Sequence, residues 1–270
     1  MIVITLIIVI VVFAWLWYNN PYYIINWWNY KIRSECDDQD KDSMNGIPSY
    51  HDAWISPSKR ATELHSLIYF NHNDILDEVM NMIKSRNSLD DHISSTNKSG
   101  NKDHKKNIPY DWLKSEDKWN PIWIRFMSEW TGVADNVPLL KNILSLFPEI
   151  SNLHISIFYP GNTIVNNVSP SRAFHRYHYG LSVPSGDIGL KINGHDVKWE
   201  ERKGFTWDDT LPHSAWNHTL QPRIIIFADI FRELSVINSL GSKIIYTMLQ
   251  HMKPVNHIKC DLEHEGVVMN

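Results

Sequence analysis

The sequence predicts an α+β fold in which short strands close a jelly-roll-type double-stranded β-helix, with helices flanking it. Apolar residues recur at helical spacing up to residue 148, and beyond that point the pattern changes to short strands. The dipeptide Asn193-Gly194, between two of these strands, is typical of a two-residue hairpin. Helices followed by a run of short strands indicate this architecture.

Three segments have the pattern of helices. Residues 62–84 contain a helix that Asn73 or Asp74 can cap, and residues 136–148 form another, with Pro138 in the first turn and Pro148 at the end. A last helix is expected over residues 240–252. The expected strands cover residues 154–159, 174–183, 188–192, 197–199, 204–207 and 223–231, with a further strand or edge segment at 119–130.

The N-terminus has the composition of a membrane anchor. An uncharged apolar run extends from Ile2 to Tyr18, and residues 21–30 resemble the aromatic belt at a membrane surface. Lys31 and Arg33 follow the run and no basic residue precedes it, so the positive-inside rule predicts a single-pass protein with its C-terminal domain in the cytoplasm.

The chain divides into four predicted parts. Residues 1–20 are the transmembrane anchor, and residues 21–60 are a juxtamembrane aromatic segment with a polar tether. The main domain covers residues 61–234 with a flexible polar insertion at 85–109, and residues 235–270 are a C-terminal helix and tail. The net charge of −4 does not favour a nucleic-acid partner.

Two histidines and two arginines make the most informative cluster. Arg176 and His178 alternate on one face of a predicted strand, His213 follows an Asp-Asp-Thr-Leu-Pro segment, and Arg223 begins the last strand. A guanidinium can bind a carboxylate through two parallel hydrogen bonds. The cluster therefore suits a dicarboxylate beside a metal ion.

These motifs resemble a known family. The helix ending in Leu-Phe-Pro148, the Tyr-Pro-Gly161 turn, the Arg-Tyr-His178 strand, the segment ending at His213 and the Arg223 strand are similar to the aspartyl/asparaginyl β-hydroxylases, from about residue 112 to 234. The aromatic segment 121–132 is similar to that of the membrane-anchored, lipid A type fatty-acyl hydroxylases of this family. The resemblance implies a cupin-like barrel that uses iron(II) and 2-oxoglutarate to hydroxylate an unactivated C–H bond.

The resemblance also implies a role for each site residue. Arg223 and Ser156 would bind the distal carboxylate of 2-oxoglutarate, and Arg176 and His178 the carboxylate nearer the metal. His213 would bind iron. Asp208 or Asp209 could orient its imidazole.

One iron ligand of the family is missing. The family has a histidine eleven residues before the position of His178, where this chain has Asn167, and an acidic residue found in some members is Ser169 here. Such a site needs about three protein ligands, or two and water. The nearby candidates to replace the histidine are Asn166, His154, His175 and His195.

The sequence leaves two functions open. One is a membrane-anchored hydroxylase that acts on an Asp or Asn side chain of a protein or on an acyl chain of a lipid. The other is an inactive relative that binds 2-oxoglutarate as a sensor or scaffold, which the loss of a ligand at Asn167 favours. A different metal or an altered ligand set would be a variant of the first.

Overall fold

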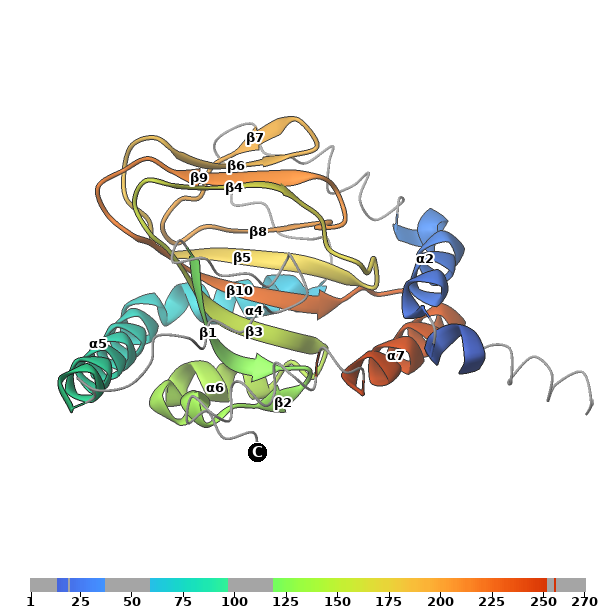
Figure 1. The fold of residues 1–270 in the computed structure, drawn as a ribbon, viewed down its shortest axis with the longest axis horizontal. Coiled ribbons are helices and arrows are strands. Elements are labelled where there is room, and N and C mark those ends of the chain that lie inside the picture. Colours follow the sequence, from blue (N-terminus) through green and yellow to red (C-terminus); the bar gives the residue numbers. More distant parts are fainter. Residues whose placement is uncertain (1–13, 19, 37–58, 97–118, 252–254, 256–270) are drawn as a thin grey trace, which may run out of the picture.

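Two stacked β-sheets with helices on one face and at one end form the protein (Figure 1). The computed structural model describes residues 14–18, 20–36, 59–96, 119–251 and 255. The larger sheet has six strands in the order β2-β1-β3-β10-β5-β8, and the smaller has four in the order β4-β9-β6-β7. The strands are β1 (Trp119–Phe126), β2 (Glu129–Trp130), β3 (Ile150–Phe158), β4 (Asn162–Asn167), β5 (Phe174–Ser182), β6 (Ile188–Ile192), β7 (His195–Val197), β8 (Gly204–Trp207), β9 (His213–Asn217) and β10 (Arg223–Phe231).

From β3 onward the chain passes back and forth between the two sheets, and the paired strands are antiparallel. Strands β3, β5, β8 and β10 belong to the larger sheet, whereas β4, β6, β7 and β9 belong to the smaller. This is the order of a double-stranded β-helix, so the predicted barrel is confirmed.

Two of these strands were not predicted. β4 and β9 are short and mostly polar, and neither has the clean alternation of apolar and polar residues that marks a half-buried strand. They pair with each other along one edge of the smaller sheet. Pairing between segments about fifty residues apart is not visible in either local sequence.

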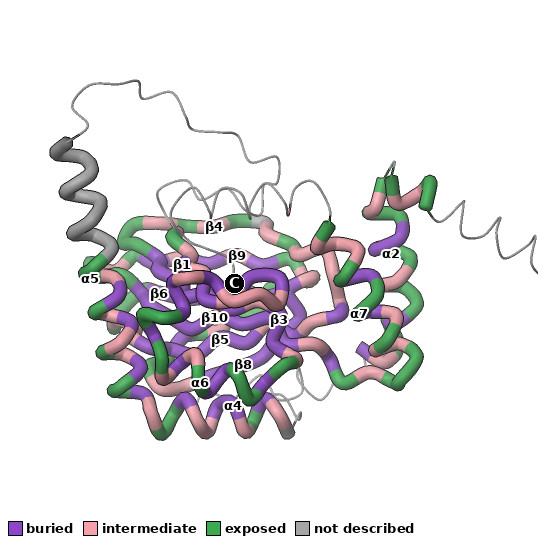
Figure 2. The backbone as a smooth tube through the Cα atoms, turned by 90° about the horizontal axis from the view of Figure 1, so that it is seen from below, coloured by how far each residue is buried: buried purple, intermediate pink, exposed green. Residues whose placement is uncertain are grey.

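Helices cover the outer face of the larger sheet. These are α4 (Lys59–Phe70), α5 (His72–Thr96), the short 3-10 helix η2 (Gly132–Asn136) and α6 (Pro138–Ser145). Leu64 and Ile75 from the helices join Ile155 and Ile226 from the sheet in one buried core (Figure 2). A second, smaller apolar cluster lies between the sheets.

The predicted helix and insertion between residues 62 and 109 need correction. The first region is two helices, and α5 continues through residue 96, so residues 85–96 are helical rather than a loop. Each further residue of an established helix adds a hydrogen bond without a new nucleation cost, so a polar sequence can extend it. Residues 97–109 lie outside the described part of the chain.

Two further helices pack together at one end of the molecule. α2 (Pro21–Lys31) lies beside α7 (Val236–Gln250), which begins four residues before the predicted start (Figure 1). The indole N–H of Trp28 donates to Ser242 Oγ at 2.9 Å. The predicted 1–20 anchor falls largely outside the described residues, and among those described no helix is both long and apolar enough to span a bilayer.

Gly180 in β5 lets the segment between β7 and β8 approach its backbone closely. A Cβ atom added there would lie 2.0 Å from the carbonyl oxygen of Glu200. We expect Gly180→Ala to lower the free energy of unfolding by about 3 kcal/mol, because backbone must shift to admit the methyl group. Chemical denaturation would measure this. Gly161→Asn is the control, because nothing lies within 4 Å of its added Cβ and Asn tolerates its positive φ; an equal loss in both would contradict the prediction.

Candidate functional site

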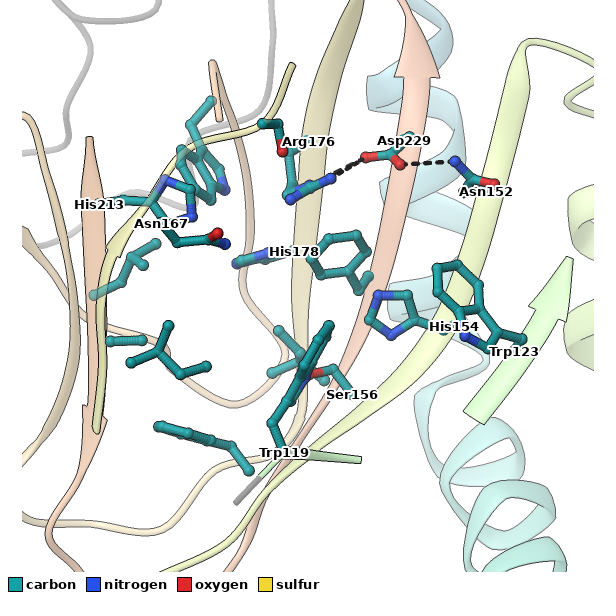
Figure 3. A pocket seen from close by; sticks show the side chains of 18 of the residues that line it. Trp119, Trp123, Asn152, His154, Ser156, Asn167, Arg176, His178, His213 and Asp229 are labelled. Carbon is teal, nitrogen blue, oxygen red and sulfur yellow. Dashed lines mark hydrogen bonds and ion pairs between the residues drawn. The ribbon is translucent and has the colours of Figure 1, made fainter. Parts of the chain in front are cut away.

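A cavity of about 150 Å³ lies between the two sheets. Side chains from β3, β5 and β10 form one wall, and side chains from β4 and β9 form the opposite wall (Figure 3). Because successive side chains of a strand point to opposite faces, every second residue of these strands faces the cavity. All six residues predicted to bind metal or cosubstrate line it, namely Ser156, Asn167, Arg176, His178, His213 and Arg223.

Arg223 is a buried cation. Its side chain is 4% exposed, and its guanidinium lies over the ring of Trp199, with 4.1 Å between the guanidinium carbon and the ring centroid. Within the described part of the chain no carboxylate pairs with it, and its Nε has no hydrogen-bond partner. Burial lowers the pKa of Arg223 to about 9, so the group remains cationic at neutral pH. An unpaired buried charge of this kind calls for an anion.

Ser156 is arranged to donate a hydrogen bond into the cavity. Its Oγ accepts from Arg223 Nη2 at 2.8 Å and from the indole Nε1 of Trp119 at 2.7 Å. A hydroxyl has two acceptor lone pairs and one hydrogen. With both lone pairs engaged, the hydrogen of Ser156 is left for a ligand.

His178 also presents a donor. The indole N–H of Trp199 donates to His178 Nδ1 at 3.1 Å, so this nitrogen carries no hydrogen. Burial, with Arg223 and Arg176 nearby, holds the pKa of His178 well below its ordinary value. The ring is therefore neutral with its hydrogen on Nε2, which has no hydrogen-bond partner. Such a nitrogen can donate to a carboxylate but has no lone pair for a metal.

His213 has the opposite tautomer. Its Nδ1 lies 2.9 Å from the carbonyl oxygen of Leu211, which can only accept, so the ring hydrogen is on Nδ1. Burial lowers the pKa of His213 to about 4. Its Nε2 therefore carries a lone pair at neutral pH, as a metal ligand requires. The expectation that Asp208 or Asp209 orients this ring is replaced by Leu211, whose carbonyl holds it.

Asn167 is the partner of His213 across the smaller sheet. The two residues are paired in register on β4 and β9, and both side chains point into the cavity (Figure 3). This register brings together two positions that are 46 residues apart in the sequence. An imidazole and an amide, rather than two imidazoles, face the same space.

Arg176 is neutralised by two carboxylates. Its Nη1 lies 2.7 Å from Asp209 Oδ2, and its Nη2 lies 2.9 Å from Asp229 Oδ1. Burial by itself would lower the pKa of Arg176, but these two charges raise it. Asp229 also accepts from Asn152 Nδ2 at 3.0 Å. Arg176 thus lines the cavity with its charge paired, in contrast to Arg223.

Asp208 fixes the turn that leads to His213. Its Oδ2 pairs with Arg172 at 2.9 Å and with Arg232 at 3.1 Å, and its Oδ1 accepts from the backbone N–H of Thr210 at 2.9 Å. The carboxylate is therefore a structural anchor rather than a partner of the imidazole.

The other histidines do not replace the missing ligand. His154 lines the cavity, and neither of its ring nitrogens has a hydrogen-bond partner. Its ring stacks on that of Phe227, with 4.0 Å between the centroids. In Figure 3, His178 lies between His154 and Asn167. His175 is buried and His195 exposed, and neither lines the cavity. The side chain of Asn166 is outside the described part. No group of three His, Cys, Asp or Glu among the described residues could hold a metal ion.

Two tryptophans at the site were not recognised as site residues. Trp119 and Trp199 donate to Ser156 and His178, so they determine which hydrogens remain for a ligand. The high tryptophan content of the sequence was the available signal, with 12 in 270 residues.

Comparison with known proteins places this geometry in context. The family model described as aspartyl/asparaginyl beta-hydroxylase matches residues 70–233, which is more than half of the chain. The ornithine lipid ester-linked acyl 2-hydroxylase of Rhizobium tropici is 32% identical over 89 residues. That match covers 32% of this chain and 32% of the relative, so the similarity spans about a third of the relative's length.

Two solved structures are distantly similar to this chain. KdgF from Halomonas sp. matches with 11% identity and a TM-score of 0.29, over 47% of this chain and 92% of that one. The cupin domain of an XRE family transcriptional regulator from Enterobacter cloacae matches with 15% identity and a TM-score of 0.27, over 32% and 84% of the two chains.

The depressed pKa of His213 makes stability depend on pH. Below pH 6.5 the unfolded chain binds a proton at this residue, whereas the folded protein does not until about pH 4. We expect the free energy of unfolding to fall as pH drops from 6.5 to 4, and His213→Gln to remove at most about 3 kcal/mol of that loss, at 1.36 kcal/mol for each pKa unit. Denaturant unfolding of the metal-free protein at several pH values would test this; an unchanged pH profile in the variant would contradict it.

Proposed function

Because the chain belongs to the aspartyl/asparaginyl beta-hydroxylase family, we propose that it is a 2-oxoglutarate-dependent hydroxylase whose cosubstrate binds in the cavity between the sheets. One observation supports the cosubstrate: Arg223 is buried and has no anionic partner among the residues that the structure describes. Arg176, the other described arginine that lines the cavity, is paired with Asp209 and Asp229. The cavity thus keeps one cation for a ligand.

The hydrogen-bond donors of the site fit a dicarboxylate. Arg223 and the hydroxyl of Ser156 would bind one carboxylate, because they adjoin each other and have free hydrogens. The Nε2–H of His178 would donate to the other end of the ligand. Since two aspartates already neutralise Arg176, we assign it the role of holding the cavity wall instead of binding a carboxylate.

The residues fit an iron ion only in part. His213 offers the lone pair of Nε2, and the amide oxygen of Asn167 opposite is a neutral and weaker ligand. When bound, iron(II) supplies the oxygen-activating chemistry that side chains lack. With so few protein ligands, we expect iron binding to depend on the cosubstrate, whose 2-oxo acid oxygens would add to the ligand set.

The apolar part of the cavity supports an acyl chain as the substrate. Trp123, Phe126 and Met127 line it next to His154, with 4.7 Å between the ring centroids of Trp123 and His154. An Asp or Asn side chain would require polar partners there, whereas an acyl chain requires only apolar contact. The relative from Rhizobium tropici is named for hydroxylating an ester-linked acyl group. A membrane anchor in the apolar run before residue 18, with the domain in the cytoplasm, belongs to the same proposal.

A second function is favoured by Asn167. Because Asn167 stands where the family has a metal-binding histidine, the protein can be a 2-oxoglutarate-binding relative without hydroxylase activity, acting as a sensor or scaffold. The two functions share the cosubstrate site and differ in whether iron binds.

Binding of 2-oxoglutarate should depend on Arg223. We expect Arg223→Gln to raise the Kd for 2-oxoglutarate by at least about 100-fold, because a buried charge pair is lost. Isothermal titration of the full chain in detergent would measure it. Lys191→Gln, which removes an exposed cation, serves as the matched control and should bind like the wild type. Equal affinities in all three proteins would refute the assigned cosubstrate site.

Iron binding should depend on 2-oxoglutarate and on residue 167. In anaerobic titrations we expect the visible charge-transfer band of a chelated complex only when both iron(II) and 2-oxoglutarate are present, and its loss in His213→Ala. Asn167→His should raise the affinity for iron(II) without cosubstrate by at least about tenfold, because imidazole is a stronger ligand than an amide.

The outcomes separate the two functions. A band in the wild type supports the hydroxylase. A band in Asn167→His alone, with 2-oxoglutarate bound by both proteins, would identify the wild type as a non-catalytic binding protein.

A further inference from the structure

Exposed apolar side chains gather on α2 and α7. On α2, Tyr23, Trp27 and Tyr30 are 65%, 56% and 75% exposed. On α7, Ile237, Leu240 and Ile244 are 80%, 60% and 52% exposed. Soluble domains rarely leave adjacent apolar residues of this size in water without a use for them.

The spacing of these residues places them on one stripe of each helix. They recur at three or four residues, which is one face of an α-helix at 3.6 residues per turn. The seam between the helices is formed by other residues, chiefly Ile24, Trp28 and Ile245.

Each stripe lies on the side away from the domain. Asn29 on α2 bonds to the loop before β5, and Tyr246 on α7 belongs to the main core. By helical geometry, Tyr246 lies roughly opposite the α7 stripe, and Asn29 lies on a different side of α2 from Tyr23 and Trp27. The two stripes together form an outward apolar surface, which we call the α2–α7 face, defined by Tyr23, Trp27, Tyr30, Ile237, Leu240 and Ile244.

The charge and composition of the α2–α7 face match a lipid surface. Neither helix contains Asp or Glu, and the charged residues within them are Lys31 and Lys243. Tryptophan and tyrosine favour the boundary between water and hydrocarbon. In the sequence, the uncharged run from Ile2 to Tyr18 leads directly to α2. A protein partner would not account for this continuity.

We propose that the α2–α7 face lies on the surface of an anionic lipid bilayer, with its aromatic and aliphatic side chains in the interfacial layer and its lysines at the phosphates. The two helices then act as an interfacial platform of the folded domain, additional to any N-terminal anchor.

The platform is connected to the cavity. Asn29 Nδ2 donates to the carbonyl of Pro170 at 2.8 Å, and the backbone N–H of Arg172 donates to Asn29 Oδ1 at 3.0 Å. These residues belong to the segment between β4 and β5, which begins just after Asn167 and includes the cavity residue Ser169. Resting on the proposed function, this contact would hold a cavity wall at a fixed position relative to the bilayer that supplies an acyl substrate.

Spin-label depth measurements would test the platform. Single-cysteine variants of the full chain at Trp27, Ile237, Ile244 and Leu220 would be labelled after replacing Cys36 and Cys260 by Ser, then reconstituted into vesicles of phosphatidylcholine and phosphatidylglycerol. Leu220 is the matched control, because it is 96% exposed in the turn between β9 and β10. Unchanged far-ultraviolet circular dichroism would establish that each variant folds.

We expect the labels at residues 27, 237 and 244 to show a several-fold higher ratio of oxygen to nickel-chelate accessibility than the label at residue 220. Equal, water-like ratios at all four positions would overturn the platform. Protection from both reagents with dipolar broadening between labels would also overturn it, by identifying a second copy of the chain as the occupant. The measurement needs neither 2-oxoglutarate nor iron, so its failure is distinct from failure of the proposed function.

Discussion

The interior of this sandwich depends on buried ion pairs made by two adjacent aspartates. Asp208 holds Arg172 and Arg232, and Asp209 holds Arg176. Because a buried charge without a partner costs several kcal/mol, these pairs cannot be exchanged for water. They fix the turn between β8 and β9, and with it the position of His213. Arg232 also donates to the carbonyl oxygen of Cys36, and the backbone N–H of Arg172 donates to Asn29 of α2. These contacts hold α2 against the barrel.

Against that balanced interior, Arg223 is the exception that defines the ligand. Its neighbours are arranged by hydrogen-bond direction as well as by charge: Trp119 and Trp199 occupy acceptors, so that Ser156 and His178 are left with donors. Leu211 does the reverse for His213, which is left with an acceptor. One end of the cavity therefore suits an anion, and the place between β4 and β9 suits a metal or another electron-pair acceptor. The weak point of the second place is Asn167.

The membrane proposal and the cavity proposal meet in one loop. The segment between β4 and β5 begins just after Asn167 and lines the cavity through Ser169. Asn29 of α2 holds this segment through a hydrogen bond to Pro170. An interfacial helix and a substrate cavity joined in this way would restrict how a lipid approaches, because the loop cannot move independently of either. The apolar residues near Trp123 would contact the acyl chain of such a lipid inside the cavity.

The sequence by itself indicated the α+β class and the barrel through the period of its apolar residues, and the order of its motifs led to the family and to the candidate site residues, including Asn167 in place of a histidine. It did not reveal β4, β9 or the contact between α2 and α7, since these rest on pairing between distant segments. It also did not reveal the extension of α5, because the polar residues there have no helical period of apolar residues. Only the tertiary structure decided that Arg176 is neutralised while Arg223 is not, and that His178 donates while His213 accepts. Those differences arise from neighbours such as Asp229, Trp199 and Leu211, which only folding brings within hydrogen-bond distance in the required orientation.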